Sequence, residues 1–400
     1  MYKFVLRRRK IEIVRNVFLY MIYLDNNATT KIAPEVLGAM MPYLTDNFAN
    51  AASTHAFGLG ASDAVKKARQ QVADLIACET NEIIFTSGAT EAINLAIKGI
   101  AENYQTKGKH IITVATEHSA VLDVCKYLTT KGFEITFLPV QSDGLIDLDV
   151  LKAALRSDTI LVSVMAVNNE TGVIQPIKEI AALAHGVGAL FMTDATQAVG
   201  KMPINVDDLG IDLLTFSGHK IHAPKGVGAL FVRQRRPRRV KLQTLIHGGG
   251  HEGGFRSGTL NVAGIVALGE ACELANKTMI ATANYVQQLR DALETELLKI
   301  EDTHINGNTE HRLYNITNIR FDGCDADAMM MGLENIAVSN GSACTATSID
   351  PSHVLIAMRL TELEAYSSIR FSLSKFNIES ELPQVIEAVR KVVRRLRAMN

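Results

Sequence analysis

The sequence lacks the features of a membrane protein and of a disulfide-stabilised secreted protein. None of its apolar runs approaches the roughly 20 residues that a transmembrane helix needs. Its cysteines are few and odd in number, and no two of them form a Cys-x-x-Cys pair. This excludes a disulfide framework and favours reduced thiols, so we expect a cytoplasmic protein.

An excess of charge of one sign is also missing, because the formal net charge is -1. No global field therefore favours a nucleic acid or a membrane surface as a partner, and we expect no direct nucleic-acid binding. Basic residues are dense only at 7–10 and 233–239, and such runs are typical of a solvated surface. Internal repeats and low-complexity segments are absent as well.

Residues 1–20 do not have the pattern of a targeting signal. A basic start is followed by a short apolar end, without a long apolar core or a clear small-residue cleavage site. An organelle-targeting peptide is also disfavoured, because serine is absent and Glu12 is acidic. A well-patterned strand opens at Met21, so we expect the true chain to begin there and residues 1–20 to be a disordered or mis-started extension.

The rest of the sequence alternates strand-like and helix-like segments. Residues 81–87 form an apolar run typical of a buried strand, and residues 88–104 follow with the helical spacing of about 3.6 residues. Further apolar runs recur up to residue 233. Strands separated by helices of about 10 to 15 residues predict βαβ units and a mostly parallel sheet.

The pattern changes after about residue 275. A long amphipathic helix is predicted at 276–300, and shorter strands and helices follow with a Gly/Ser-rich loop near residue 340. We interpret this part as a smaller α+β domain to which the strand around Tyr23 returns. The predicted large domain is 34–275, and the predicted small domain is 21–33 plus 276–400.

Polar residues collect where predicted strands end, which is where an open α/β sheet binds its ligands. Ala89 and Thr90 begin a helix after one strand, and a helix N-terminus favours a phosphate. Alone, this segment is more typical of an ordinary helix cap. Asp194 ends another strand, where a carboxylate can be a helix cap, a metal ligand or the partner of a protonated ring nitrogen. No second carboxylate or histidine lies nearby at metal-ligand spacing.

Two further strand ends carry groups that suit acid–base and amine chemistry. Ser217, His219 and Lys220 share one short turn, and a neutral lysine amine can form a Schiff base with an aldehyde. His118 follows another strand and could stack on a ring as an acid or base. Each residue alone is more typical of a structural or surface role. Together, the phosphate cradle, the carboxylate and the amine predict a site for pyridoxal 5'-phosphate (PLP).

Nine segments resemble the NifS/IscS-type cysteine desulfurases, in the same order and from about Met21 to the final helix. They are YLDNNATT, FTSGATEAINLAIKG, TEHSAVLD, VNNETGVIQP, DATQAVGK, FSGHKIHAPKGVGAL, HGGGHEGGFRSGTLNV, SNGSACTA and SSIRFSLS. The resemblance implies the α/β fold-type I architecture of PLP-dependent transferases. That architecture has a large PLP-binding domain with a mostly parallel sheet, a smaller α+β C-terminal domain and a homodimeric assembly.

The resemblance also implies a role for each matching residue. Lys220 is the Schiff-base lysine, Asp194 pairs with the pyridine nitrogen, and Gln197 bonds the ring hydroxyl. His118 stacks on the ring and moves protons. The implied phosphate ligands are Thr90, Ser217 and His219, together with Thr259, which reaches the phosphate of the neighbouring subunit, and Ala89 is also implied to contact the cofactor. The implied substrate-carboxylate ligands are Asn169, which also borders the cofactor, and Arg370.

Cys344 lies among Gly, Ser, Ala and Thr residues, which predicts a mobile exposed loop. Cys78, Cys125 and Cys272 lie in apolar helical patterns and are predicted to be buried and inert, while the acidic neighbours of Cys324 disfavour a thiolate. The resemblance implies that Cys344 takes the sulfur of L-cysteine as a persulfide and leaves alanine. The resemblance also makes Cys344 a candidate for a transient ligand of an iron–sulfur cluster.

Several alternatives stay open at this point. The sulfur acceptor is expected to be a protein of iron–sulfur cluster assembly, tRNA thiolation or DNA phosphorothioation. Within PLP enzymes, a selenocysteine lyase or an aminotransferase of the same fold competes with the desulfurase. Outside them, a thiol hydrolase using Cys344 and a histidine, or a non-catalytic sulfur-relay protein, are the rival classes. Asn340 and Ser374 depart from the usual family residues, but neither removes a chemical group.

Overall fold

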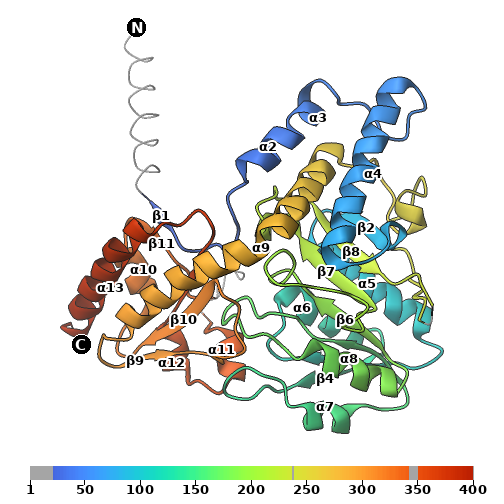
Figure 1. The fold of residues 1–400 in the computed structure, drawn as a ribbon. Helices are drawn as coiled ribbons and strands as arrows, with labels where there is room; N and C mark the ends of the chain where they lie inside the picture. The colour runs from blue at the N-terminus through green and yellow to red at the C-terminus, as the bar shows by residue number, and fades with distance from the viewer. Residues whose placement is uncertain (1–20, 237, 342–349, 400) are drawn as a thin grey trace, which may run out of the picture.

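The computed structural model describes residues 21–236, 238–341 and 350–399, and its largest element is a seven-stranded sheet (Figure 1). The strand order is β2-β8-β7-β6-β5-β3-β4. β8 is antiparallel to both of its neighbours, and the other adjacent pairs are parallel, which confirms the predicted mostly parallel sheet. The strands are β2 (Ile83–Thr86), β3 (His110–Val114), β4 (Glu134–Leu138), β5 (Thr159–Ser163), β6 (Leu190–Asp194), β7 (Leu213–Ser217) and β8 (Gly228–Val232).

Both faces of this sheet are covered, which explains why its strands are continuous apolar runs. Successive side chains of a strand point to opposite faces. Leu213 and Leu230 accordingly belong to one apolar core, and Leu214 and Phe231 belong to the other. Helices α5 (Ala89–Tyr104) and α6 (Ser119–Thr129) supply the first core, and helices α4 (Ala56–Ile76), α8 (Ile177–Gly186) and α9 (Val262–Leu297) supply the second.

Helix α9 is longer than the predicted helix at 276–300, since it begins at Val262 behind an Asn261 cap. Its first half packs residues such as Leu268 into the core of the large sheet. Its second half packs residues such as Leu293 into the core of the small domain. The apolar stripe changes direction between the two halves, so the sequence pattern did not reveal one continuous helix. The predicted boundary at 275 falls inside α9 and stays a prediction.

The C-terminal part forms a second, smaller layer of sheet and helix. A three-stranded antiparallel sheet has the order β12 (Ser368–Ser372), β10 (Ile316–Phe321) and β9 (Thr303–Ile305). β1 (Ile22–Tyr23) pairs with β11 (Ile336–Ala337), so the N-terminal strand does return to this part of the chain. Its helices are α10 (Ala326–Gly332), α11 (His353–Ala357), α12 (Glu362–Tyr366) and α13 (Leu382–Arg397).

The remaining elements are short. Helices α2 (Pro34–Met40) and α3 (Pro42–Thr45) project with α4 beyond the main sheet in Figure 1, and α7 (Leu148–Ala154) precedes β5. Four turns of 3-10 helix are η1 (Thr80–Glu82), η2 (Gly218–Lys220), η3 (Glu252–Gly254) and η4 (Glu379–Glu381). Among the described residues, no helix combines the length and apolarity that a membrane crossing requires.

Candidate active site

Most of the predicted site residues line one cavity of about 530 Å³ beside the carboxyl ends of the parallel strands. They are Ala89, Thr90, His118, Asn169, Asp194, Gln197, Ser217, His219, Lys220 and Arg370. Two predicted residues are not in this group. Thr259 is exposed on the loop before α9 and does not line the cavity, and Cys344 lies outside the described residues.

Lys220 ends the short turn η2 that follows β7, which brings its amine into the cavity. The Nζ atom donates to the backbone oxygens of Asn27 at 2.6 Å and Ala28 at 2.8 Å. These oxygens belong to a segment nearly 200 positions earlier in the chain. Sequence analysis assigned them no role, although a polar run directly after the strand of Tyr23 was a signal for a site.

Asp194 ends β6 with only 5% of its surface exposed, and its Oδ1 accepts from the backbone N–H of Thr196 at 3.0 Å. Glu117 lies close to it and is fully buried. Burial, and then the charge of Asp194, raise the pKa of Glu117 well above its ordinary value. The neutral form of Glu117 is therefore favoured beside the Asp194 carboxylate.

His118 is the N-cap of α6, and its Nδ1 accepts from the backbone N–H of Ala120 at 3.1 Å. Burial is the main cause that lowers the pKa of His118. The ring is therefore neutral near pH 7. Since Nδ1 is the acceptor, its proton lies on Nε2. This arrangement gives the cavity one fixed histidine tautomer.

The start of α5 forms an anion cradle. Ala89 and Thr90 are the first residues of this 16-residue helix, and their backbone N–H groups have no partner within the helix. Ser217 and His219 border the same part of the cavity from β7 and η2. A helix N-terminus flanked by hydroxyl and imidazole groups is suited to a phosphate.

This cradle depends on a close backbone approach at Gly228, the first residue of β8. A Cβ atom there would lie 2.6 Å from the backbone oxygen of Phe216 and 2.7 Å from Cα of Gly88. We expect Gly228→Ala to lower the free energy of unfolding by about 1–3 kcal/mol and to displace the cradle. Thermal unfolding and cofactor retention measure the two effects.

Gly60→Ala is the matched control, since its Cβ would meet nothing within 4 Å on helix α4. Alanine favours a helix interior, so this control should leave stability unchanged or raise it by up to about 1 kcal/mol. If Gly228→Ala and Gly60→Ala showed the same stability and the same cofactor retention, the close backbone approach at Gly228 would not be what supports the cradle.

Arg370 reaches the cavity from β12 of the small domain, with 4% of its surface exposed. One of its terminal nitrogens forms an ion pair with Asp25 at 2.7 Å, and the other donates to the backbone oxygen of Asn169 at 3.0 Å. Arg370 Nε and Asn169 Oδ1 are buried without a hydrogen-bond partner among the described residues. The N–H at Arg370 Nε can therefore donate to a carboxylate that enters the cavity, whereas Asn169 Oδ1 can only accept from a donor.

The described cysteines have little thiolate character. Cys125, Cys272 and Cys324 are buried, and burial is the largest cause that raises the pKa of each. Cys78 was predicted to lie within a helix, but it follows the end of α4 and is only half-buried. Burial still raises the pKa of Cys78, with the charge of Glu82 adding to the effect.

Two histidines near the site predict a loss of stability in acid. Burial lowers the pKa of His219 and of His222 to about 4, so the unfolded chain binds more protons than the folded chain between about pH 6.5 and 4. The contribution of the two neutral histidines to the free energy of unfolding is fully present above this pH window, and it is lost as the pH decreases through the window. Allowing for partial exposure, we expect a loss on the order of 1 kcal/mol per histidine, measured by chemical denaturation across this range.

His222→Asn isolates one of these two groups. His222 has φ 69°, a left-handed conformation that asparagine tolerates better than most residues. The variant should therefore fold, and its stability should depend less steeply on pH than that of the unchanged chain. An identical pH dependence would show that His222 does not contribute.

The chain belongs to the class-V aminotransferase family, whose family model matches residues 22–385. It is 51% identical to "Cysteine desulfurase IscS" of Pectobacterium carotovorum over 95% of this chain and 94% of that protein. Among solved structures, a "NifS-like protein" superposes with a TM-score of 0.88 at 36% identity, covering 94% of this chain and 99% of that one. "SspA in complex with cysteine" superposes with a TM-score of 0.79 at 38% identity, covering 89% of this chain and 100% of that one.

Proposed function

We propose that the protein is a cysteine desulfurase, which converts L-cysteine into L-alanine and passes the sulfur to an acceptor protein. The observation that carries the proposal is the convergence of Lys220, Asp194 and the anion cradle on one cavity. Relatives named as cysteine desulfurases share half of the residues over nearly the whole chain. A similar solved structure is described with cysteine itself, which supports cysteine as the substrate.

The residues of the cavity fit PLP as the cofactor. The start of α5 would hold the phosphate, Asp194 the ring nitrogen and Gln197 the ring hydroxyl. The Thr196 hydroxyl also lines the cavity and is buried without a partner among the described residues, as expected where a polar ligand completes the site. When bound, PLP supplies an aldehyde for an amine and a protonated ring that accepts an electron pair.

The protein's own side chains would divide the remaining work. Arg370 and Asn169 hold the substrate carboxylate, and the Lys220 amine and the neutral His118 ring move protons. Cys344 accepts the sulfur. The step balances as L-cysteine plus the Cys344 thiol giving L-alanine plus the Cys344 persulfide, with the C–S bond broken and an S–S bond formed.

The proposed assembly is a homodimer, and it is supported by the position of Thr259, which is exposed and lies outside the cavity of its own chain. In the proposed dimer Thr259 contacts the phosphate bound to the neighbouring subunit. An exposed apolar surface on α2 to α4 suits such an assembly, and its residues are Leu37, Met41, Leu44, Phe48, Phe57 and Leu59.

The proposed setting is the cytoplasm, where thiols stay reduced. The acceptor belongs to iron–sulfur cluster assembly, tRNA thiolation or DNA phosphorothioation. Where the acceptor is an iron–sulfur scaffold, Cys344 is also proposed as a transient ligand of the cluster.

Product analysis tests the proposal. Purified protein with PLP, L-cysteine and excess thiol reductant should form alanine and sulfide in equal amounts. Pyruvate and ammonia in place of alanine would indicate β-elimination and contradict the persulfide step. Selenide released from L-selenocysteine, with no sulfide from L-cysteine, would favour a selenocysteine lyase instead.

A further inference from the structure

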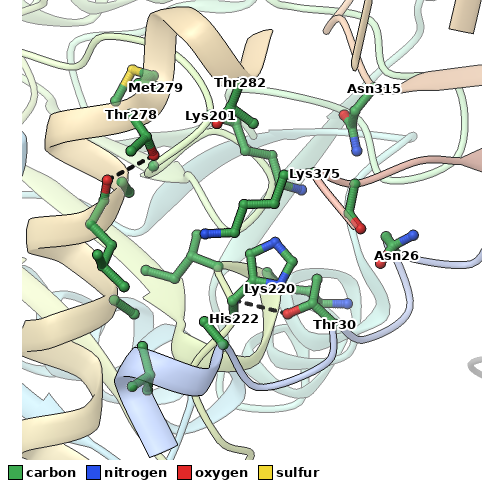
Figure 2. A pocket seen from close by; sticks show the side chains of 18 of the residues that line it. Asn26, Thr30, Lys201, Lys220, His222, Thr278, Met279, Thr282, Asn315 and Lys375 are labelled. Carbon is green, nitrogen blue, oxygen red and sulfur yellow. Dashed lines mark hydrogen bonds between the residues drawn. The ribbon is translucent and has the colours of Figure 1, made fainter. Parts of the chain in front are cut away.

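A second lysine lies behind the active-site cavity. Lys201 is 9% exposed and borders a smaller cavity of about 50 Å³, which Lys220 also borders (Figure 2). The middle of α9 forms one wall of this smaller cavity. Lys201 is not among the residues that line the larger cavity, so we expect it to act on a ligand there through another residue.

Lys201 instead contacts a residue that does line the larger cavity. Its Nζ donates to Oε1 of Gln197 at 2.7 Å. At the other end of the same amide, Nε2 of Gln197 donates to the backbone oxygen of Asn27 at 3.0 Å. That oxygen also accepts from Lys220 at 2.6 Å, so one chain of hydrogen bonds joins the two lysines through Gln197 and Asn27.

These two contacts fix the orientation of the Gln197 amide. A backbone oxygen only accepts hydrogen bonds, so the end of the amide next to Asn27 must be the nitrogen. Asn27 borders the larger cavity and Lys201 borders the smaller one. The amide oxygen therefore faces away from the ligand site, and the second N–H of the amide is available to a ligand oxygen there.

We propose that Lys201 is a positioning residue for the desulfurase reaction: it holds Gln197 with the amide nitrogen toward the active-site cavity, and so fixes the donor for the ring hydroxyl of PLP. This inference rests on the proposed function. Without the amine, the buried amide oxygen loses its partner, and only the bond to Asn27 still holds the side chain in this orientation.

The protonation of Lys201 suits this role. Burial, with the nearby charges of Lys220 and Arg370, lowers the pKa of Lys201 to about 7. The side chain can therefore be a neutral donor near pH 7. In this form it adds less positive charge behind Lys220 than an ordinary lysine would.

The test compares holoenzymes in two readouts besides turnover: the dissociation constant of PLP, and the pH titration of the bound chromophore. Lys201→Met keeps the apolar chain and removes the donor. It should weaken PLP binding about three- to tenfold and shift the titration midpoint. Lys375→Met is the matched control, because Lys375 borders the same small cavity and the contacts of Gln197 do not involve it. This control should leave both readouts unchanged.

Two further variants distinguish a positioning role of Lys201, exerted through Gln197, from a general effect of changing its side chain. In a Gln197→Ala background, Lys201→Met should have no further effect, because the residue through which it acts is gone. Lys201→Gln keeps an N–H donor and should lose less than Lys201→Met. Fully additive losses in the double variant, or equal losses in Met and Gln, would overturn the proposal. So would wild-type values in Lys201→Met. An unchanged chain that binds no PLP would instead overturn the proposed function, and this inference with it.

Discussion

Replacing Lys220 by alanine is expected to reduce alanine formation from L-cysteine at least about 1000-fold, since the variant loses both the amine that holds the cofactor and a proton carrier. The same change leaves the backbone oxygens of Asn27 and Ala28 without their donor. We therefore also expect a loss of about 1–3 kcal/mol in the free energy of unfolding. Single-turnover kinetics and chemical denaturation measure the two effects separately.

Lys220→Arg distinguishes the chemical role from the structural one. A guanidinium keeps the positive charge and can still donate to the two oxygens, but it stays protonated at any accessible pH and cannot act as a free amine. The arginine variant should therefore recover stability without recovering activity. Turnover by either variant within about 100-fold of the unchanged chain would show that another amine serves the reaction.

The parts of the fold and site that could be predicted are those encoded locally. Strands buried on both faces are apolar runs, and the polar residue that ends each run lies at the carboxyl edge of the sheet. Asp194 and Lys220 illustrate this, because Asp194 is the last residue of β6 and Lys220 follows β7 within a few positions. Parallel strands bring such positions to one edge, so residues from four separate strand ends could be grouped before any coordinates were known.

The parts that were not predicted depend on contacts between distant segments. The bond from Lys220 to Asn27 joins residues separated by 193 positions, and no periodicity encodes it. Lys201 was assigned no role from the sequence, and its burial appears only when α9 packs against it. The start of α9 was missed for a similar reason, because its two halves face different cores.

Replacing Cys344 by serine is the second change with a large expected effect. Cysteine turnover to alanine and sulfide should fall at least about 100-fold, while the bound chromophore and its response to L-cysteine persist. Loss of the thiol removes the sulfur acceptor but none of the groups proposed to hold PLP. Product analysis together with absorbance spectra before and after addition of L-cysteine measures both results.

The other thiols in the described part of the chain are poor substitutes for Cys344. Burial raises the pKa of Cys125 to about 12 and also raises that of Cys78, Cys272 and Cys324, so each is protonated near pH 7. Cys78→Ser is the matched control, since Cys78 is the least buried of these four and should be dispensable for turnover. A Cys344→Ser variant that still forms alanine and sulfide at the original rate would rule out the persulfide step. An aminotransferase or a lyase without a cysteine nucleophile would then explain the site better, because neither reaction needs a thiol from the protein.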